Sequence, residues 1–305
     1  MITQQKKNRT RNQHYIPQVY LRGFSPEYSR LEKCEKKRYT IYFYDFEKNR
    51  MTGNSVPIKS VCYEKNLYEV TGDDGNIICQ NFLEKCLSKL ENMFGKYRSD
   101  LEKKAFNEEN YKIKCFLKRE EKAFWITYMT LQILRLPETL EIVENVAKQM
   151  FGNEIPEHKL KSAVRSICLP FFKELTLGAP LAQIFDFFVN QLGSMNIAVG
   201  VDRAGRIITS DNPVFICSKE TSPLNFEKVI FPVSSEICLF LLMDNDKEKY
   251  YKNVCFEINE SFREEIIKNM SARAFSKLFS NHILDCTEMR YLKESMPMRQ
   301  MSGGE

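Results

Sequence analysis

Strand-like and helical patterns occupy separate stretches of this 305-residue chain, and this segregation limits its fold more than any other feature. Strand-like sequence comes first, helical sequence fills the middle, and strand-like sequence returns before a last helical segment. Strands and helices in separate runs predict an α+β fold instead of a doubly wound sheet. We therefore expect mostly antiparallel sheets packed against a central helical layer, with a helix at the C-terminus.

The strand-like stretches are rich in aromatic and β-branched residues. Turn residues at 47–50, 72–75 and 202–205 lie between successive stretches and predict three hairpins. The expected strands are residues 39–46, 66–70, 77–78, 196–201, 206–209, 228–231, 236–243 and 254–258.

Helical periodicity begins near Asn81, where apolar residues recur at helical spacing as far as Leu101. Three prolines stand at positions that suit the first turns of later helices, and Asn259 suits the N-cap of the last one. A short helix is also expected after Pro17. The other expected helices are residues 119–136, 137–150, 156–175, 180–192 and 260–279.

No internal repeat or low-complexity linker divides the chain, so we expect one α+β domain over residues 13–295. Residues 1–12 carry four basic residues and no acid, and residues 296–305 are expected to be a flexible tail. Such a basic arm attracts phosphate, although a solvated, frayed terminus has the same composition. The net charge of +5 is too small to indicate a nucleic-acid partner by itself.

The ten cysteines are scattered, and no two form a C-x-x-C pair. A chain of this length does not need disulfides, so a reducing cytoplasm is the expected location. The apolar stretches are too short or too interrupted to span a bilayer, and no membrane association is expected. The sequence also lacks the P-loop and the dinucleotide, zincin and serine-hydrolase signatures.

The first candidate site follows the arm, where His14 and Tyr15 precede a short apolar segment and Arg22 follows it. A histidine with a pKa near neutrality can act as a general base, a phosphate contact or a metal ligand. A hydrogen-bonded structural histidine is the alternative.

The second candidate lies in the apolar helix predicted over residues 119–136. Tyr128, Gln132 and Arg135 share one face of it through i, i+4 and i+3 spacing. Buried amide and guanidinium groups need partners, because an unsatisfied one costs about 1–3 kcal/mol or more. These residues therefore predict an internal polar network, which is either a ligand pocket or structural support.

Two further candidates contain acids. Asp211 and Asn212 lie in a Ser-Asp-Asn-Pro turn after a predicted strand, a position that suits a metal ligand or catalytic carboxylate but also ordinary turn chemistry. Glu84 and Glu91 lie seven residues apart on one side of the long helix. They could hold a hard cation or belong to a solvated helical face.

Together these motifs resemble an uncharacterised family, domain of unknown function number 4238. The resemblance rests on His14-Tyr15-Ile16-Pro17, Leu21-Arg22-Gly23-Phe24, Glu84 and Glu91, Gln132 to Pro137, Ser210 to Val214, Phe231-Pro232-Val233-Ser234 and Asn259. It spans nearly the whole chain, and Val233 stands where the family tends to have leucine. The resemblance implies that the polar elements form one site, but it brings no established activity.

Three hypotheses follow. In the first, the protein is a hydrolase, a metal-dependent nuclease or other phosphoester-cleaving enzyme with a divalent cation such as Mg²⁺, and antiphage defence would suit it. In the second, it is a non-catalytic module that binds nucleic acid or a nucleotide through the basic arm and the arginines. In the third, His14, Arg135 and Asp211 form a purely structural network. The hydrolase hypothesis assigns catalysis to His14 and Asp211, substrate binding to Tyr15, Arg22, Gln132, Arg135 and Asn212, and metal binding to Asp211 and Glu91.

Overall fold

The computed structural model of the protein describes residues 12–29, 38–69, 82–107, 115–151, 155–168, 179–219, 222–243 and 253–302. Within these ranges it contains helices together with three sheets that pair mostly antiparallel, and its last element is a helix. The predicted α+β class is therefore confirmed.

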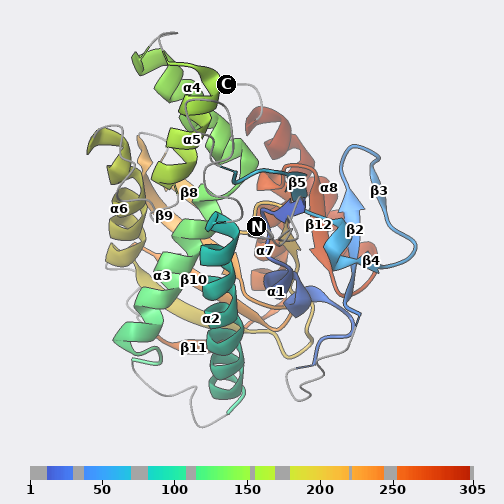
Figure 1. Ribbon diagram of the computed structural model, residues 1–305. Coiled ribbons are helices and arrows are strands. Elements are labelled where there is room, and N and C mark those ends of the chain that lie inside the picture. Colours follow the sequence, from blue (N-terminus) through green and yellow to red (C-terminus); the bar gives the residue numbers. More distant parts are fainter. Residues whose placement is uncertain are drawn as a thin grey trace, which may run out of the picture.

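The elements follow the predicted order of strands, helices and strands (Figure 1). The helices are α1 Gln18–Leu21, α2 Phe82–Ala105, α3 Arg119–Leu134, α4 Pro137–Phe151, α5 Glu157–Cys168, α6 Ala179–Ser194, α7 Glu260–Arg273 and α8 Cys286–Ser302, with short 3-10 turns at Arg22–Phe24 and Ile58–Ser60. The strands are β1 Asn12–His14, β2 Thr40–Asp45, β3 Arg50–Met51, β4 Val56–Pro57, β5 Tyr63–Lys65, β6 Asn196–Val201, β7 Thr209–Ser210, β8 Phe215–Lys219, β9 Ser222–Pro232, β10 Ile237–Leu242, β11 Cys255–Glu257 and β12 Lys277–Ser280.

The first large sheet has the order β11-β6-β10-β9-β8, with only the β11–β6 pair parallel. Helices cover both of its faces. Phe231 of β9 contacts Tyr128 of α3 on one face, whereas Phe240 of β10 contacts Phe262 of α7 on the other. A strand that is buried on both faces exposes neither row of its side chains to solvent, which explains the unbroken apolar run of β10.

The second large sheet has the order β3-β2-β12-β7, and β4 also pairs with β2. The hairpin of β2 and β3 confirms the first predicted turn. A third, two-stranded sheet joins β1 to β5. One core of buried side chains connects α1, α2 and α3 to both large sheets, and a smaller cluster joins α4 and α5 to Leu67 and Tyr68.

The predicted hairpin of residues 196–201 with 206–209 is wrong. β6 pairs with β10 and β11, while β7 pairs with β12 in the other sheet. The cause lies in Asp202, whose carboxylate accepts the N–H groups of Ala204 and Arg206 and is held by Arg263 of α7. This capped turn leads the chain away from β6 instead of back along it.

The predicted helix over residues 260–279 begins where expected but is shorter, because α7 ends at Arg273 and β12 follows. The N–H groups of Phe275, Ser276 and Lys277 donate to the carboxylate of Asp211, so they are withdrawn from helical hydrogen bonding. Beyond β12, α8 extends to Ser302, so part of the predicted flexible tail is helical.

Other predictions fall partly outside the described residues. Residues 66–69 form a turn after β5 instead of a strand, and the rest of the second predicted hairpin lies outside the described ranges, as does the basic arm up to residue 11. The cysteines whose side chains the structure describes are unpaired; they are Cys62, Cys86, Cys115, Cys217, Cys238, Cys255 and Cys286. In that part of the chain, no helix is both long and apolar enough to cross a membrane.

Candidate functional site

The segment Gln13–Tyr15 forms the centre of the site. Gln13 and His14 belong to β1, which pairs with β5 in the register His14↔Tyr63. The N–H of Tyr15 donates to the carbonyl of Cys62 at 3.0 Å. Strand alternation places Gln13 inside, where it is 1% exposed, and leaves the His14 side chain half-buried. Pro17 then fixes the start of α1, because its carbonyl accepts the N–H groups of Tyr20 and Leu21.

Gln13 fixes the turn that follows β5. Its Nε2 donates to Glu69 Oε1 at 3.2 Å, and its Oε1 accepts the backbone N–H of Tyr68 at 2.6 Å. Both ends of the buried amide are therefore used, as a buried amide requires. This contact holds the Tyr68 ring near the end of α3, where it meets Arg135.

Arg135 is the hub of the first cluster and is only 2% exposed. Its Nη2 donates to the carbonyl of His14 at 2.6 Å, its Nη1 to Glu91 Oε1 at 3.2 Å and its Nε to the hydroxyl of Tyr68 at 3.2 Å. The Tyr68 hydroxyl in turn donates to the carbonyl of Arg135 at 3.0 Å. One guanidinium thus joins β1, α2 and the turn after β5, and the predicted contact between the His14 segment and α3 exists.

The polar face predicted for α3 is present, but part of it has no partner. Tyr128 and Gln132 are almost fully buried, yet the Tyr128 hydroxyl and Gln132 Oε1 make no hydrogen bond with the described residues. Glu84 Oε2 of α2 is likewise buried and unpaired. Burial raises the pKa of Glu84. The charges of Glu91 and Glu69 raise it further, whereas the charge of Arg135 lowers it.

Asp211 is fully engaged within the protein. Its Oδ1 accepts the N–H of Phe275 at 2.8 Å, and its Oδ2 accepts from Ser276 N, Ser276 Oγ and Lys277 N at 2.7, 2.8 and 2.9 Å. Burial raises the pKa of this carboxyl, and these hydrogen bonds oppose the rise. The residue therefore acts as the cap that connects α7 to β12.

The neighbours of Asp211 in the sequence stabilise the same connection between α7 and β12. Ser210 Oγ donates to the carbonyl of Asn212 at 2.6 Å, which closes the turn. Asn212 Nδ2 donates to the carbonyl of Arg273, the last residue of α7, at 3.1 Å. The predicted substrate contact Asn212 thus holds the end of a helix.

A second cluster lies beside Asp211 and joins the candidate Tyr15 to Cys62 and Glu138, which the sequence pattern did not single out. Tyr15, Cys62 and Glu138 all interact electrostatically with the Asp211 carboxylate, and the Tyr15 hydroxyl hydrogen-bonds the Cys62 thiol. Burial raises the pKa of both Tyr15 and Cys62. Cys62 has a backbone φ of 55°, an uncommon left-handed conformation for a residue other than glycine.

Glu138 has the most distinctive environment of this cluster. It lies in the first turn of α4, three residues after Arg135, and its Oε2 is buried without a partner in the described residues. Burial raises its pKa to about 7, and the charges of Asp211, Glu64 and Glu141 contribute. A carboxyl group that titrates near neutrality can both accept and return a proton at working pH.

A cleft of about 360 Å³ has Pro137 and Glu141 in its lining, on either side of Glu138 in the sequence, while Glu138 itself is not among the lining residues. The helices α4 and α5 and the segment after β5 line it, with Glu64, Pro137, Glu141, Lys148, Lys161 and Arg165 among its walls. Two of its cations are paired: Arg165 with Glu144 at 2.9 Å and Lys161 with Glu157 at 2.6 Å. Glu64 and Glu141, the two lining acids whose charges act on Glu138, are among the other walls.

The His14 side chain contacts the 3-10 turn Ile58–Ser60. Its Nε2 lies 3.2 Å from the carbonyl of Lys59, which can only accept, so this nitrogen carries the proton. The ring lies 5.6 Å from that of Tyr63. Burial lowers the His14 pKa, the hydrogen bond to Lys59 opposes this, and Arg135 adds to the lowering. The neutral tautomer leaves Nδ1 as an acceptor.

Two of the expected roles find no support in the contacts. Arg22 is exposed and stacks over Tyr39 at 5.4 Å, away from both clusters. Glu91 and Asp211 have separate partners, and no group of three or more His, Cys, Asp or Glu side chains in the described ranges could hold a metal ion. The metal role of this pair stays a prediction.

Comparison with known proteins gives one match. No curated protein and no solved structure matches the chain. Residues 12–282 match the family described as "Protein of unknown function (DUF4238)", a span that includes both clusters and ends before α8. Since this match covers most of the chain, the protein belongs to the family of unknown function DUF4238.

Proposed function

We propose that the protein is a hydrolase in which Glu138 is the general base and Tyr15 assists it. The observation that supports this most is the Glu138 carboxyl itself, which is partly buried, has one oxygen without a partner among the described residues, and follows Pro137, a residue of the cleft lining. Both oxygens of Asp211 accept hydrogen bonds, whereas Oε2 of Glu138 accepts none from the described residues.

The chemistry is an ordinary hydrolysis. Glu138 takes a proton from water, and the resulting hydroxide forms a bond to the electrophilic atom of the substrate. The Tyr15 hydroxyl, which stays protonated because burial raises its pKa, donates to the oxygen on which charge develops. The bond to the leaving group then breaks, and Glu138 returns its proton to that group.

The acids around Glu138 limit the substrate. Glu64 and Glu141 would repel a phosphoester, so cleavage of a phosphodiester requires a divalent cation that offsets their charge. An uncharged carboxylic ester or amide needs none. Phosphoester cleavage, including a nuclease activity in antiphage defence, is therefore proposed only together with Mg²⁺ or a similar ion.

The test compares two model substrates, p-nitrophenyl acetate and bis(p-nitrophenyl) phosphate, the latter with and without Mg²⁺. We expect release of p-nitrophenol from at least one of them and a rate that rises with pH through about 7. Glu138→Gln keeps the shape of the side chain and should reduce the rate by at least about 100-fold. The control is Glu47→Gln in the exposed turn after β2, which should retain full activity.

Two outcomes would refute the proposal: no hydrolysis of any substrate, or equal rates for Glu138→Gln and the unchanged protein. The competing view is a purely structural network, which the internal hydrogen bonds of Asp211 and Arg135 favour. Under that view, His14→Ala and Asp211→Ala unfold the protein instead of leaving it folded and inactive. No described contact favours the nucleic-acid-binding alternative, whose basic arm lies outside the described residues.

A further inference from the structure

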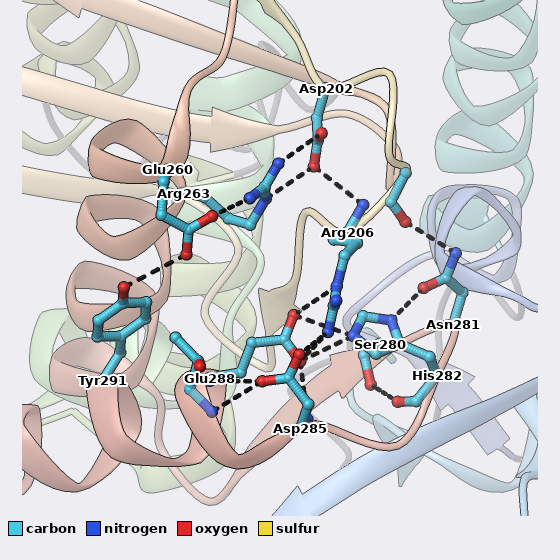
Figure 2. Close-up of polar contacts among 12 residues, drawn as sticks. Asp202, Arg206, Glu260, Arg263, Ser280, Asn281, His282, Asp285, Glu288 and Tyr291 are labelled. Atoms are coloured by element: carbon cyan, nitrogen blue, oxygen red, sulfur yellow. Dashed lines mark hydrogen bonds and ion pairs between the residues drawn. The ribbon is translucent and has the colours of Figure 1, made fainter.

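A third polar cluster attaches α8, which begins after the family match ends, to the rest of the protein. We call it the C-terminal latch and define it as Arg206, Asn281, His282, Asp285 and Glu288 (Figure 2). Arg206 comes from the segment between β6 and β7, Asn281 and His282 follow β12, and Glu288 lies in the first turn of α8. None of these residues takes part in the proposed hydrolysis.

Glu288 is the centre of the latch and is only 3% exposed. Its carboxylate accepts from Arg206 Nε at 3.1 Å, from the backbone N–H of Asp285 at 3.0 Å and from His282 Nε2 at 3.0 Å. Asp285 also binds Arg206 directly. The start of α8 is therefore held by one guanidinium and one imidazole.

Both nitrogens of the His282 ring face oxygen atoms. Nε2 faces the Glu288 carboxylate, and Nδ1 lies 2.6 Å from Asn281 Oδ1. The orientation of the Asn281 amide is fixed, because its Nδ2 donates to the carbonyl of Gly205 at 3.0 Å. A neutral imidazole carries one N–H and can donate to only one of the two oxygens, whereas the imidazolium donates to both.

The surrounding charges favour the same protonated form. The contacts around His282 include one guanidinium, Arg206, and two carboxylates, Asp285 and Glu288. The neighbouring ion pairs also contain one guanidinium and two carboxylates, because Arg263 lies between Asp202 and Glu260 (Figure 2). One added proton on His282 therefore balances the inner layer and reduces the negative charge of the whole cluster.

We propose that His282 makes the C-terminal latch sensitive to pH, holding α8 closed when the ring is protonated and loosening it when the proton leaves. Without that proton, His282 loses one of its two hydrogen bonds and the inner layer gains an uncompensated negative charge. Imidazole side chains as a class change their charge between about pH 5 and 8, so this is the range to test.

The experiment is amide hydrogen exchange of the full chain at about pH 6 and about pH 8, corrected for the intrinsic exchange rate. We expect the protection of α8 amides to fall about tenfold at the higher pH, which is the effect of losing one hydrogen bond to a charged group. His282→Gln cannot take up a proton, so its α8 should show the same protection at both values. His158→Gln in α5 is the matched control and should keep the pH dependence.

Equal protection of α8 at both values in the unchanged protein would overturn the proposal, as would an unaltered pH dependence in His282→Gln. A second measurement needs no variant. Nitrogen-15 NMR of the unchanged protein should show protons on both ring nitrogens of His282 at about pH 6 and on only one at about pH 8. A ring with a single proton throughout this range would also overturn it.

Discussion

Replacing Glu138 with glutamine should make the protein more stable at alkaline pH while it abolishes the proposed activity. Burial and the neighbouring acids raise the pKa of the Glu138 carboxyl to about 7 in the folded protein, above its ordinary value of 4.5. The folded state therefore resists the ionisation that the unfolded chain undergoes freely. Glutamine is neutral at every pH and carries no such cost.

The size of the effect follows from the two pKa values. Each pKa unit corresponds to 1.36 kcal/mol, so a fully buried carboxyl with these values would lose about 3.4 kcal/mol of stability between acid and alkaline pH. The Glu138 side chain is partly exposed, and solvent screening reduces the figure to about 1.5 kcal/mol. Since the pKa of Glu138 is raised in the folded protein, the protonated carboxyl stabilises the fold fully below about pH 4.5. This stabilisation is lost as the pH rises through about 7.

The assay is urea denaturation of both proteins at several values between about pH 4 and 8. Glu138→Gln should exceed the unchanged protein by about 1.5 kcal/mol at about pH 8, and the difference should disappear near pH 4. Glu47→Gln should show no difference at either end, because that side chain is exposed. A glutamine variant that is equally or less stable at about pH 8 would show that the Glu138 carboxylate is already well solvated or paired.

Three further substitutions test the packing and the hydrogen-bonded hubs. Gly23→Ala should lose about 1–3 kcal/mol in urea denaturation, because an added Cβ would lie 2.9 Å from Arg98 Nη1 and 3.0 Å from Ser234 Cβ; an unchanged midpoint would contradict this close approach. Asp211→Asn should cost about 3 kcal/mol in the same assay, since at least one partner N–H would face an amide nitrogen. A loss below about 0.5 kcal/mol would mean that the cap is dispensable. Arg135→Met leaves a carbonyl and a carboxylate without their donor and should cost about 3–5 kcal/mol, so a near-normal melting temperature would refute its role as a hub.

The elements that sequence patterns predicted well are those with a strong local signal. The apolar run of β10, the proline at the start of α4 and the Asn259 cap of α7 each depend on residues close in sequence. Asn259 Oδ1 accepts the N–H of Phe262 at 3.0 Å, as an N-cap does. In such cases local chemistry and tertiary packing agree.

The failures have long-range causes. Nothing within residues 260–279 ends α7 at Arg273, because the carboxylate that captures the following N–H groups belongs to Asp211, more than sixty residues earlier. The turn after β6 fails for the same reason, since Arg263 holds its Asp202 from a distant helix. Neither contact leaves a periodic signal in the sequence.

In the candidate site, too, local sequence patterns predict some features, whereas others depend on distant residues. The shared face of Tyr128, Gln132 and Arg135 follows from helical spacing and is present in the structure. Glu138 could not be recognised, because its pKa depends on burial and on Asp211 and Glu64, which other segments supply. The only local hint was its place in the first turn after Pro137, where an acid is common for purely helical reasons.

The distribution of hydrogen bonds separates the residues that shape the protein from those that can act on another molecule. Asp211 and Arg135 resemble catalytic residues in type, but their groups are engaged by the backbone and by neighbouring side chains. A substrate could bind them only after those bonds break, at a cost of about 1–3 kcal/mol each. Glu138 has a buried oxygen that no described group satisfies. The motif residues Asp211 and Arg135 therefore hold the structure together, and Glu138 is the group that we propose to be reactive.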